Sequence, residues 1–216
     1  MRVAAFLAGL TLCTMTLGTI TFGTMAFAHG DHDHGTPPAE PLDLSGAVTP
    51  LPWEVGGPFT LIDHTGQTRS EVDPDGRHQL LFFGYAACPG ICSAALPLMA
   101  DAVDALAQDG VEVSPLLLTI DPSLDTVDTM GPALAALSPA FIGLTGEPEA
   151  LQSAYSAYQV SFEQLFIDPE YGPIYSHGAH IYLLDPDGKV LTLLPPVLPT
   201  DQIVAIIKRY TEATLN

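Results

Sequence analysis

From Leu51 onward, the chain alternates short apolar runs with segments whose apolar residues recur every three or four positions. Short apolar runs bounded by turn residues are typical of buried strands, and a spacing of three to four is typical of amphipathic helices. The pattern predicts a closing hairpin around the Asp185–Gly188 turn and one last helix. The expected strands are residues 59–62, 79–84, 111–120, 141–144, 181–184 and 189–194, and the expected helices are residues 95–106, 126–137, 148–158 and 200–210.

This order of elements indicates an α/β layer fold that includes some antiparallel pairing. A length of 216 residues suits one domain, or at most two small ones. We therefore assign residues 51–216 to a single globular domain.

The first segment differs from this domain in having no charge at all between residues 3 and 28. Arg2 precedes it, and it ends in Ala26-Phe27-Ala28, a small-x-small pattern typical of secretory cleavage sites. An uncleaved membrane anchor is the alternative, because the apolar stretch exceeds the roughly 20 residues needed to span a bilayer. Both interpretations place the domain outside the cytoplasm, in a periplasm or on the outer face of an inner membrane.

Residues 29–50 are rich in His, Asp, Gly and Pro and have no apolar period, which predicts a flexible tether. If cleavage follows Ala28, the new amino group and the imidazole of His29 can chelate a metal ion, and His32 and His34 can add nitrogen ligands. This is a possible auxiliary metal site. The alternative is a solvated spacer without a ligand.

Charge excludes several classes of partner. The chain has 25 Asp and Glu residues against 6 Lys and Arg, a formal net charge of -19 and a pI near 4.2. Nucleic-acid binding needs a basic surface, and so does electrostatic attachment to anionic lipid. We expect no nucleic-acid partner, and membrane contact only through the N-terminal segment if it is retained. Strong negative charge also favours the approach of cations.

Cys88 and Cys92 follow a predicted buried strand and stand at the start of a predicted helix. Positions i and i+4 share one helix face, so two thiolates there can hold one soft metal ion or close into a disulfide. A helix N-terminus also stabilises thiolates. The spacing leaves open a metal chelate, a redox-active disulfide and a structural disulfide.

A third ligand would come from elsewhere in the chain. His177 and His180 immediately precede the strand at 181–184, and spacing alone does not separate them. His64 and His78 occur in turn-like segments, where we expect solvated side chains.

The domain resembles the Sco/SenC family of copper-binding, thioredoxin-like proteins. The resemblance covers nearly the whole globular part, and its most specific feature is the CxxxC motif after FGY. The matching segments are GGPFTLIDHTGQ (56–67), LLFFGYAACPGIC (80–92), LLTIDPSLDT (117–126), FIGLTGEPEAL (141–151) and SHGAHIYLLDPDGKV (176–190).

The resemblance implies a thioredoxin-like fold with a central mixed sheet, flanking helices and an N-terminal hairpin. It implies that Cys88, Cys92 and His177 are the copper ligands, and that His180 is not. It also implies that Asp121 is a nearby carboxylate that orients a ligand or the loop.

The function implied by the resemblance is delivery of one copper ion, as Cu(I) or Cu(II), to the dinuclear copper site of cytochrome c oxidase subunit II. Exchange with other copper chaperones is a further possible partnership. The alternative is a thiol–disulfide oxidoreductase that keeps the cysteines of that subunit reduced, with Cys88 and Cys92 as its redox pair. The first interpretation describes a metallochaperone and not an enzyme.

Overall fold

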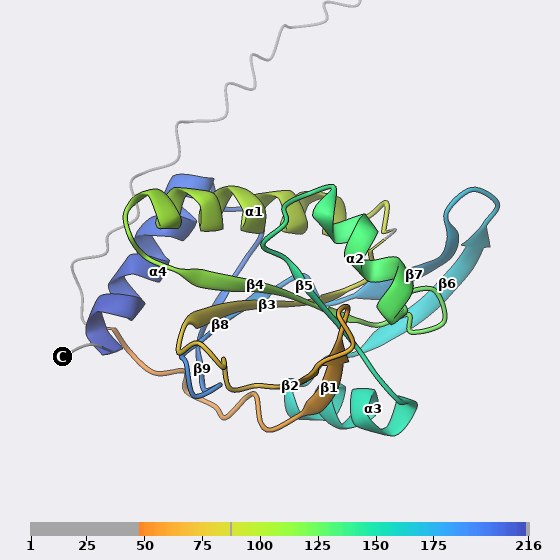
Figure 1. The fold of residues 1–216 in the computed structure, drawn as a ribbon, viewed down its shortest axis with the longest axis horizontal. Helices are drawn as coiled ribbons and strands as arrows, with labels where there is room; N and C mark the ends of the chain where they lie inside the picture. Colours follow the sequence, from red (N-terminus) through yellow and green to blue (C-terminus); the bar gives the residue numbers. More distant parts are fainter. Residues whose placement is uncertain (1–47, 87, 215–216) are drawn as a thin grey trace, which may run out of the picture. The chain divides into compact units, whose positions relative to one another are not determined.

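The computed structural model describes residues 48–86 and 88–214. A seven-stranded mixed sheet forms the centre, with strands in the order β2-β1-β5-β4-β3-β8-β9, and a separate two-stranded sheet pairs β6 with β7 (Figure 1). The strands are β1 (Thr60–Asp63), β2 (Thr68–Ser70), β3 (His78–Gly84), β4 (Val113–Thr119), β5 (Ile142–Thr145), β6 (Phe162–Asp168), β7 (Gly172–His177), β8 (Ile181–Leu184) and β9 (Val190–Leu194). The helices are α1 (Cys92–Gln108), α2 (Val127–Ala135), α3 (Pro148–Ala157) and α4 (Thr200–Thr214).

The central strands β3 and β4 are buried at every position, as their continuous apolar sequences predict. They pair in parallel, and β4 also pairs in parallel with β5. β8 joins β3 in the antiparallel direction, and β1 joins β5 in the same way, so the sheet is mixed. β1 and β2 form the expected N-terminal hairpin.

The helices cover both faces of this sheet. α1 packs against β4 and α4, and α3 lies on the opposite side, near β1 (Figure 1). The buried side of α1 includes Ala95, Leu96, Met99, Val103 and Leu106, the positions whose spacing predicts the helix. The order β3–α1–β4 places the β3–α1 loop, which carries the cysteines, at the carboxyl end of a central strand, where α/β folds commonly form their sites.

The sequence pattern missed the β6–β7 ribbon (residues 162–177). It forms a sheet of its own, and most β6 residues are exposed. Leu165, Phe166 and Ile167 are 57%, 55% and 69% exposed. Phe162 and Tyr175, by contrast, pack against the core. Three consecutive exposed apolar residues break the alternation of apolar and polar positions that reveals a half-buried strand.

The predicted leader at 1–28 and the histidines His29, His32 and His34 lie outside the described residues, and so does most of the tether at 29–50. Within the part that is described, none of the helices combines the length and apolar character needed to cross a membrane.

Candidate metal centre

The two cysteines belong to different local structures. Cys92 is the first residue of α1, after the N-cap residue Ile91. Cys88 lies in the turn before the helix, where its backbone N–H donates to the carbonyl of Tyr85 at 3.2 Å. The pair therefore does not share a helix face, as its spacing alone suggested, and the turn brings the sulfurs together instead. Both cysteines are buried and free.

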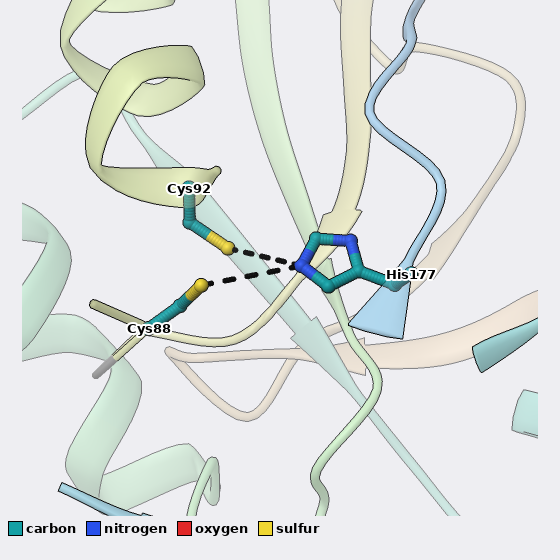
Figure 2. A group of neighbouring side chains, drawn as sticks. All are labelled: Cys88, Cys92 and His177. Carbon is teal, nitrogen blue, oxygen red and sulfur yellow. Dashed lines mark hydrogen bonds between the residues drawn. The ribbon is translucent and has the colours of Figure 1, made fainter. Parts of the chain in front are cut away.

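His177 is the last residue of β7, and it brings its imidazole to the sulfurs from another part of the chain (Figure 2). Its Nε2 lies 3.5 Å from Sγ of Cys92 and 4.0 Å from Sγ of Cys88. The three candidate ligand atoms all lie within 4.8 Å of one another. Nδ1 is 2.9 Å from the carbonyl of Gly178, so a hydrogen on Nδ1 leaves Nε2 free to bind a metal. In the metal-free site, a hydrogen on Nε2 can instead be donated to a sulfur.

These distances fit a single metal ion. Metal–sulfur and metal–nitrogen bonds of about 2.3 and 2.0 Å, as for zinc, place sulfur and nitrogen about 3.7 Å apart in a trigonal site. The two sulfur–nitrogen distances of 3.5 and 4.0 Å bracket that value. The donor set, two thiols and one imidazole, suits a soft ion.

The two thiols differ in acidity. A hydrogen bond from Cys92 is the main factor that lowers the pKa of Cys88, to about 4, and a hydrogen bond with His177 contributes in the same direction. The same interaction with Cys88, followed by burial, raises the pKa of Cys92. The metal-free site therefore holds one thiolate, at Cys88, and one thiol, at Cys92. Binding of a metal to both sulfurs displaces the proton of Cys92.

Asp125, which the sequence analysis did not select, holds the cysteine loop. Its Oδ2 accepts hydrogen bonds from the backbone N–H of Ala86 at 3.0 Å and from the hydroxyl of Thr119 at 2.8 Å. It is 4% exposed, and burial raises the pKa of its carboxyl group. Ala86 is two residues from Cys88, so this carboxylate fixes the loop where it leaves β3.

Asp121, the carboxylate expected near the site, is also buried, but it does not bond the three candidate ligands among the described residues. Its Oδ1 accepts from the hydroxyl of Ser123 at 2.5 Å, and its N–H donates to Oγ1 of Thr119 at 2.9 Å. Burial of Tyr175 is the main factor that raises the pKa of its hydroxyl group, and the charge of Asp121 is the next. Asp121 thus lies close to the β6–β7 ribbon. The sequence signal for Asp125 was its place in the same segment, DPSLD.

Gly84 leaves room for the site at the end of β3. A Cβ atom there would lie 2.9 Å from Sγ of Cys92 and 2.8 Å from the ring of Phe82. Only glycine therefore fits beside this sulfur without displacement of a neighbour.

The sulfurs are reachable from one side. A cavity of about 240 Å³ borders both of them, and most of its lining is apolar. The residues around it are Ala86, Cys88, Cys92, Ser93, Leu96, Pro97 and Leu137.

The other histidines lie elsewhere. His180 is exposed and borders a different small cavity with Phe83 and Tyr182. Nδ1 of His64 accepts a hydrogen bond from the N–H of Gly143 at 3.1 Å. The expectation that His78 is solvated is wrong. This residue is 9% exposed because it belongs to the buried strand β3, and burial lowers its pKa.

Comparison with known proteins identifies the family. The family model described as SCO1/SenC matches residues 49–212. The chain belongs to the SCO1/SenC family. It is 37% identical over 134 residues to protein SenC of Rhodobacter capsulatus, a match that covers 62% of this chain and 60% of SenC. The chain thus spans about three-fifths of the length of that curated relative.

Solved structures of Sco proteins share the fold. The copper-bound structure of Arabidopsis thaliana ScoI matches with a TM-score of 0.67 and 28% identity, and covers 73% of this chain and 99% of that one. BsSco, described as having a disulfide switch and as a member of the Sco family of cytochrome c oxidase assembly proteins, matches with a TM-score of 0.57 and 26% identity, over 76% and 97% of the two chains. The thioredoxin-like fold expected from the sequence is confirmed.

Proposed function

We propose that this protein is an extracytoplasmic copper chaperone that binds one copper ion through Cys88, Cys92 and His177. The observation that carries the proposal is the convergence of these three ligand atoms within 4.8 Å from two separate parts of the chain. A relative with 28% identity, Arabidopsis ScoI, has a structure with copper bound. The donor set and the relative support the same metal.

The donor chemistry favours copper over zinc. Thiolates are soft ligands that select Cu(I), and imidazole accepts either oxidation state of copper. Two thiolates and a neutral imidazole give a site charge of −1 with Cu(I) (+1 − 2) and zero with Cu(II) (+2 − 2). A structural zinc site closes with four ligands, whereas three are brought together here. One site can thus hold copper in both states.

The copper ion is cargo, and the site has a route for its release. The cavity beside Cys88 and Cys92 admits ligands from an acceptor protein, which replace the three ligands one at a time. The apolar residues Leu96, Pro97 and Leu137 around it provide a surface for contact with that acceptor. We assign the acceptor role to the dinuclear copper site of cytochrome c oxidase subunit II, because a relative is described as an oxidase assembly protein.

The uncharged segment at 3–28 supports a location in a periplasm or on the outer face of an inner membrane. In this proposal residues 1–28 are a signal peptide or anchor, and residues 29–50 tether the copper-binding domain at 51–216.

A thiol–disulfide function is the second candidate, and the acidity of Cys88 favours it. A thiolate is the attacking species in disulfide exchange, and the thiol of Cys92 lies beside it to resolve the mixed disulfide. In that reaction the two thiols lose two electrons and two protons and form a disulfide, and the substrate disulfide becomes two thiols.

A titration with Cu(I) in the presence of a competing chelator tests the primary proposal. The reduced protein should bind one copper ion per chain. His177→Ala should weaken binding by more than tenfold, and the neighbouring variant His180→Ala should have little effect because His180 lies outside the ligand group.

Equal losses in the two variants, or no copper binding, would contradict the proposal. Rapid turnover of a disulfide substrate without copper, abolished by Cys88→Ser, would favour the second candidate instead.

A further inference from the structure

The β6–β7 ribbon has few attachments to the rest of the domain. Among the described residues, the N–H of Tyr175 donates to Oη of Tyr85 at 3.4 Å, and the hydroxyl of Tyr175 lies close to the carboxylate of Asp121. The other polar contacts are those of His177 with the two cysteines. Ring packing of Phe162 on Tyr155, at 5.1 Å between centroids, adds an apolar contact. The position of His177 therefore depends on a small number of interactions.

Tyr85 makes contacts with both halves of the site. It follows Gly84 at the end of β3 and is 2% exposed. Its backbone carbonyl accepts the N–H of Cys88 at 3.2 Å. Its ring meets the ring of Tyr175 edge-on at 5.4 Å and that of His177 at 6.2 Å. One buried residue thus links the cysteine turn, through its backbone carbonyl, to the strand that carries the histidine, through its side chain.

We propose that Tyr85 is a positioning residue whose hydroxyl group holds the β6–β7 ribbon so that Nε2 of His177 faces the two sulfurs. The hydroxyl accepts from the N–H of Tyr175, two residues before His177, and it also lies near Cys88. The proposed effect of Tyr85 on metal binding is the part that passes through His177. That part of the inference rests on the proposed copper site, whereas the attachment of the ribbon does not.

The substitution Tyr85→Phe removes the acceptor of the Tyr175 N–H and keeps the ring. Tyr182→Phe is the matched control. Its hydroxyl is also buried and also bonds backbone, donating to the carbonyl of Tyr158 at 3.0 Å, and its ring packs on Phe83 and Tyr158, away from the ribbon. Each variant loses one hydrogen bond from a buried tyrosine, so general destabilisation is similar in both.

The first measurement uses the metal-free, reduced protein and does not depend on copper. Amide hydrogen exchange at Tyr175 should become roughly 2- to 13-fold faster in Tyr85→Phe, the range that follows from a net hydrogen bond of about 0.5–1.5 kcal/mol. Exchange in Tyr182→Phe should match the wild-type rate. Unchanged exchange at Tyr175 in Tyr85→Phe would overturn the inference, even if the protein binds copper as proposed.

The second measurement is Cu(I) affinity by chelator competition. Tyr85→Phe should bind about 3- to 10-fold more weakly than the wild type, and Tyr182→Phe should bind equally well. In the His177→Ala background, Tyr85→Phe should cause a clearly smaller loss, because the part of its effect that acts through the imidazole is already missing. A loss of the same size in that background would show a purely structural role and overturn the inference. If the wild type does not bind copper, the proposed function is wrong. The attachment of the ribbon through Tyr85 is still decided by the amide exchange at Tyr175.

Discussion

The cysteine loop and the β6–β7 ribbon supply ligands to one site but are built in different ways. The loop follows the fully buried strand β3, and the buried carboxylate of Asp125 fixes it. The ribbon forms a sheet of its own, and its apolar residue Ile167 is 69% exposed. The comparison shows that the core holds the two sulfurs in place, whereas the imidazole of His177 belongs to the β6–β7 ribbon, which has few contacts with the rest of the domain. In the proposed function, such a site would hold copper and would open when an acceptor replaces His177.

The largest effect should come from the firmly held half. Cys88→Ser or Cys92→Ser removes a thiolate ligand. Loss of a group that only hydrogen-bonds a metal ligand lowers metal affinity by up to roughly 100-fold, so loss of the ligand itself should lower Cu(I) affinity by more than that. His177→Ala should cost less than either. Chelator competition measures all three variants, with His180→Ala as the control. A histidine variant that loses more affinity than the cysteine variants would reverse the comparison.

The next effect concerns stability. Asp125→Ala leaves the N–H of Ala86 and the hydroxyl of Thr119 without their buried acceptor, which should lower the free energy of unfolding by about 1–3 kcal/mol. Ile167→Ser, on the exposed ribbon, should change it by less than about 0.5 kcal/mol. Urea denaturation measures both. Asp101→Ala, an exposed position on α1, is the control for loss of a carboxylate. Similar losses in the free energy of unfolding for Asp125→Ala and Ile167→Ser would contradict the idea that the cysteine loop is held more firmly than the ribbon.

A smaller effect should appear in the acidity of Cys88. Its pKa of about 4 lies below that of an ordinary thiol, so the thiolate persists as pH falls from 9 to 6. The rate of Cys88 alkylation should therefore change little over that range, whereas Cys92, whose pKa is raised, should stay slow to react. Mass spectrometry of iodoacetamide-treated protein separates the two sites. In His177→Ala the pKa of Cys88 should rise, because a hydrogen bond that stabilises the thiolate is lost. A rate that falls tenfold per pH unit below 8 in the wild type would contradict this assignment.

Much of the domain could be predicted because its core strands contain continuous apolar runs, residues 80–83 in β3 and 115–118 in β4. β3 and β4 are buried at all positions, so their sequences reveal them without any alternation. The ribbon could not be predicted, since Leu165 and Phe166 are exposed apolar residues that interrupt any alternation along β6. The expected solvation of His78 was wrong because β3 begins one residue before the predicted strand at 79–84, and His78 is buried within it.

The site was predictable only in part. The spacing of Cys88 and Cys92 indicates a paired thiol site, but it does not choose between His177 and His180. That choice came from the family resemblance. The roles of Tyr85 and Asp125 depend on contacts across 90 and 39 residues of sequence, which no local pattern reveals.

The smallest expected effect lies in the N-terminal tether. If His29, His32 and His34 form an auxiliary site, a chain that begins at His29 should bind a second, weaker Cu(II) ion. Deletion of residues 29–35 should remove that ion and leave the first one bound. Metal analysis after equilibrium dialysis measures the stoichiometry. An unchanged second-copper count in the deletion variant would assign the segment to a solvated spacer.

X-ray absorption at the copper edge of the reduced, Cu(I)-loaded protein tests the central claim most directly. The account predicts two sulfur ligands and one nitrogen ligand per copper in the wild type, and loss of the nitrogen ligand in His177→Ala alone. A wild-type site with only nitrogen and oxygen ligands, or one that keeps its nitrogen in His177→Ala, would contradict it.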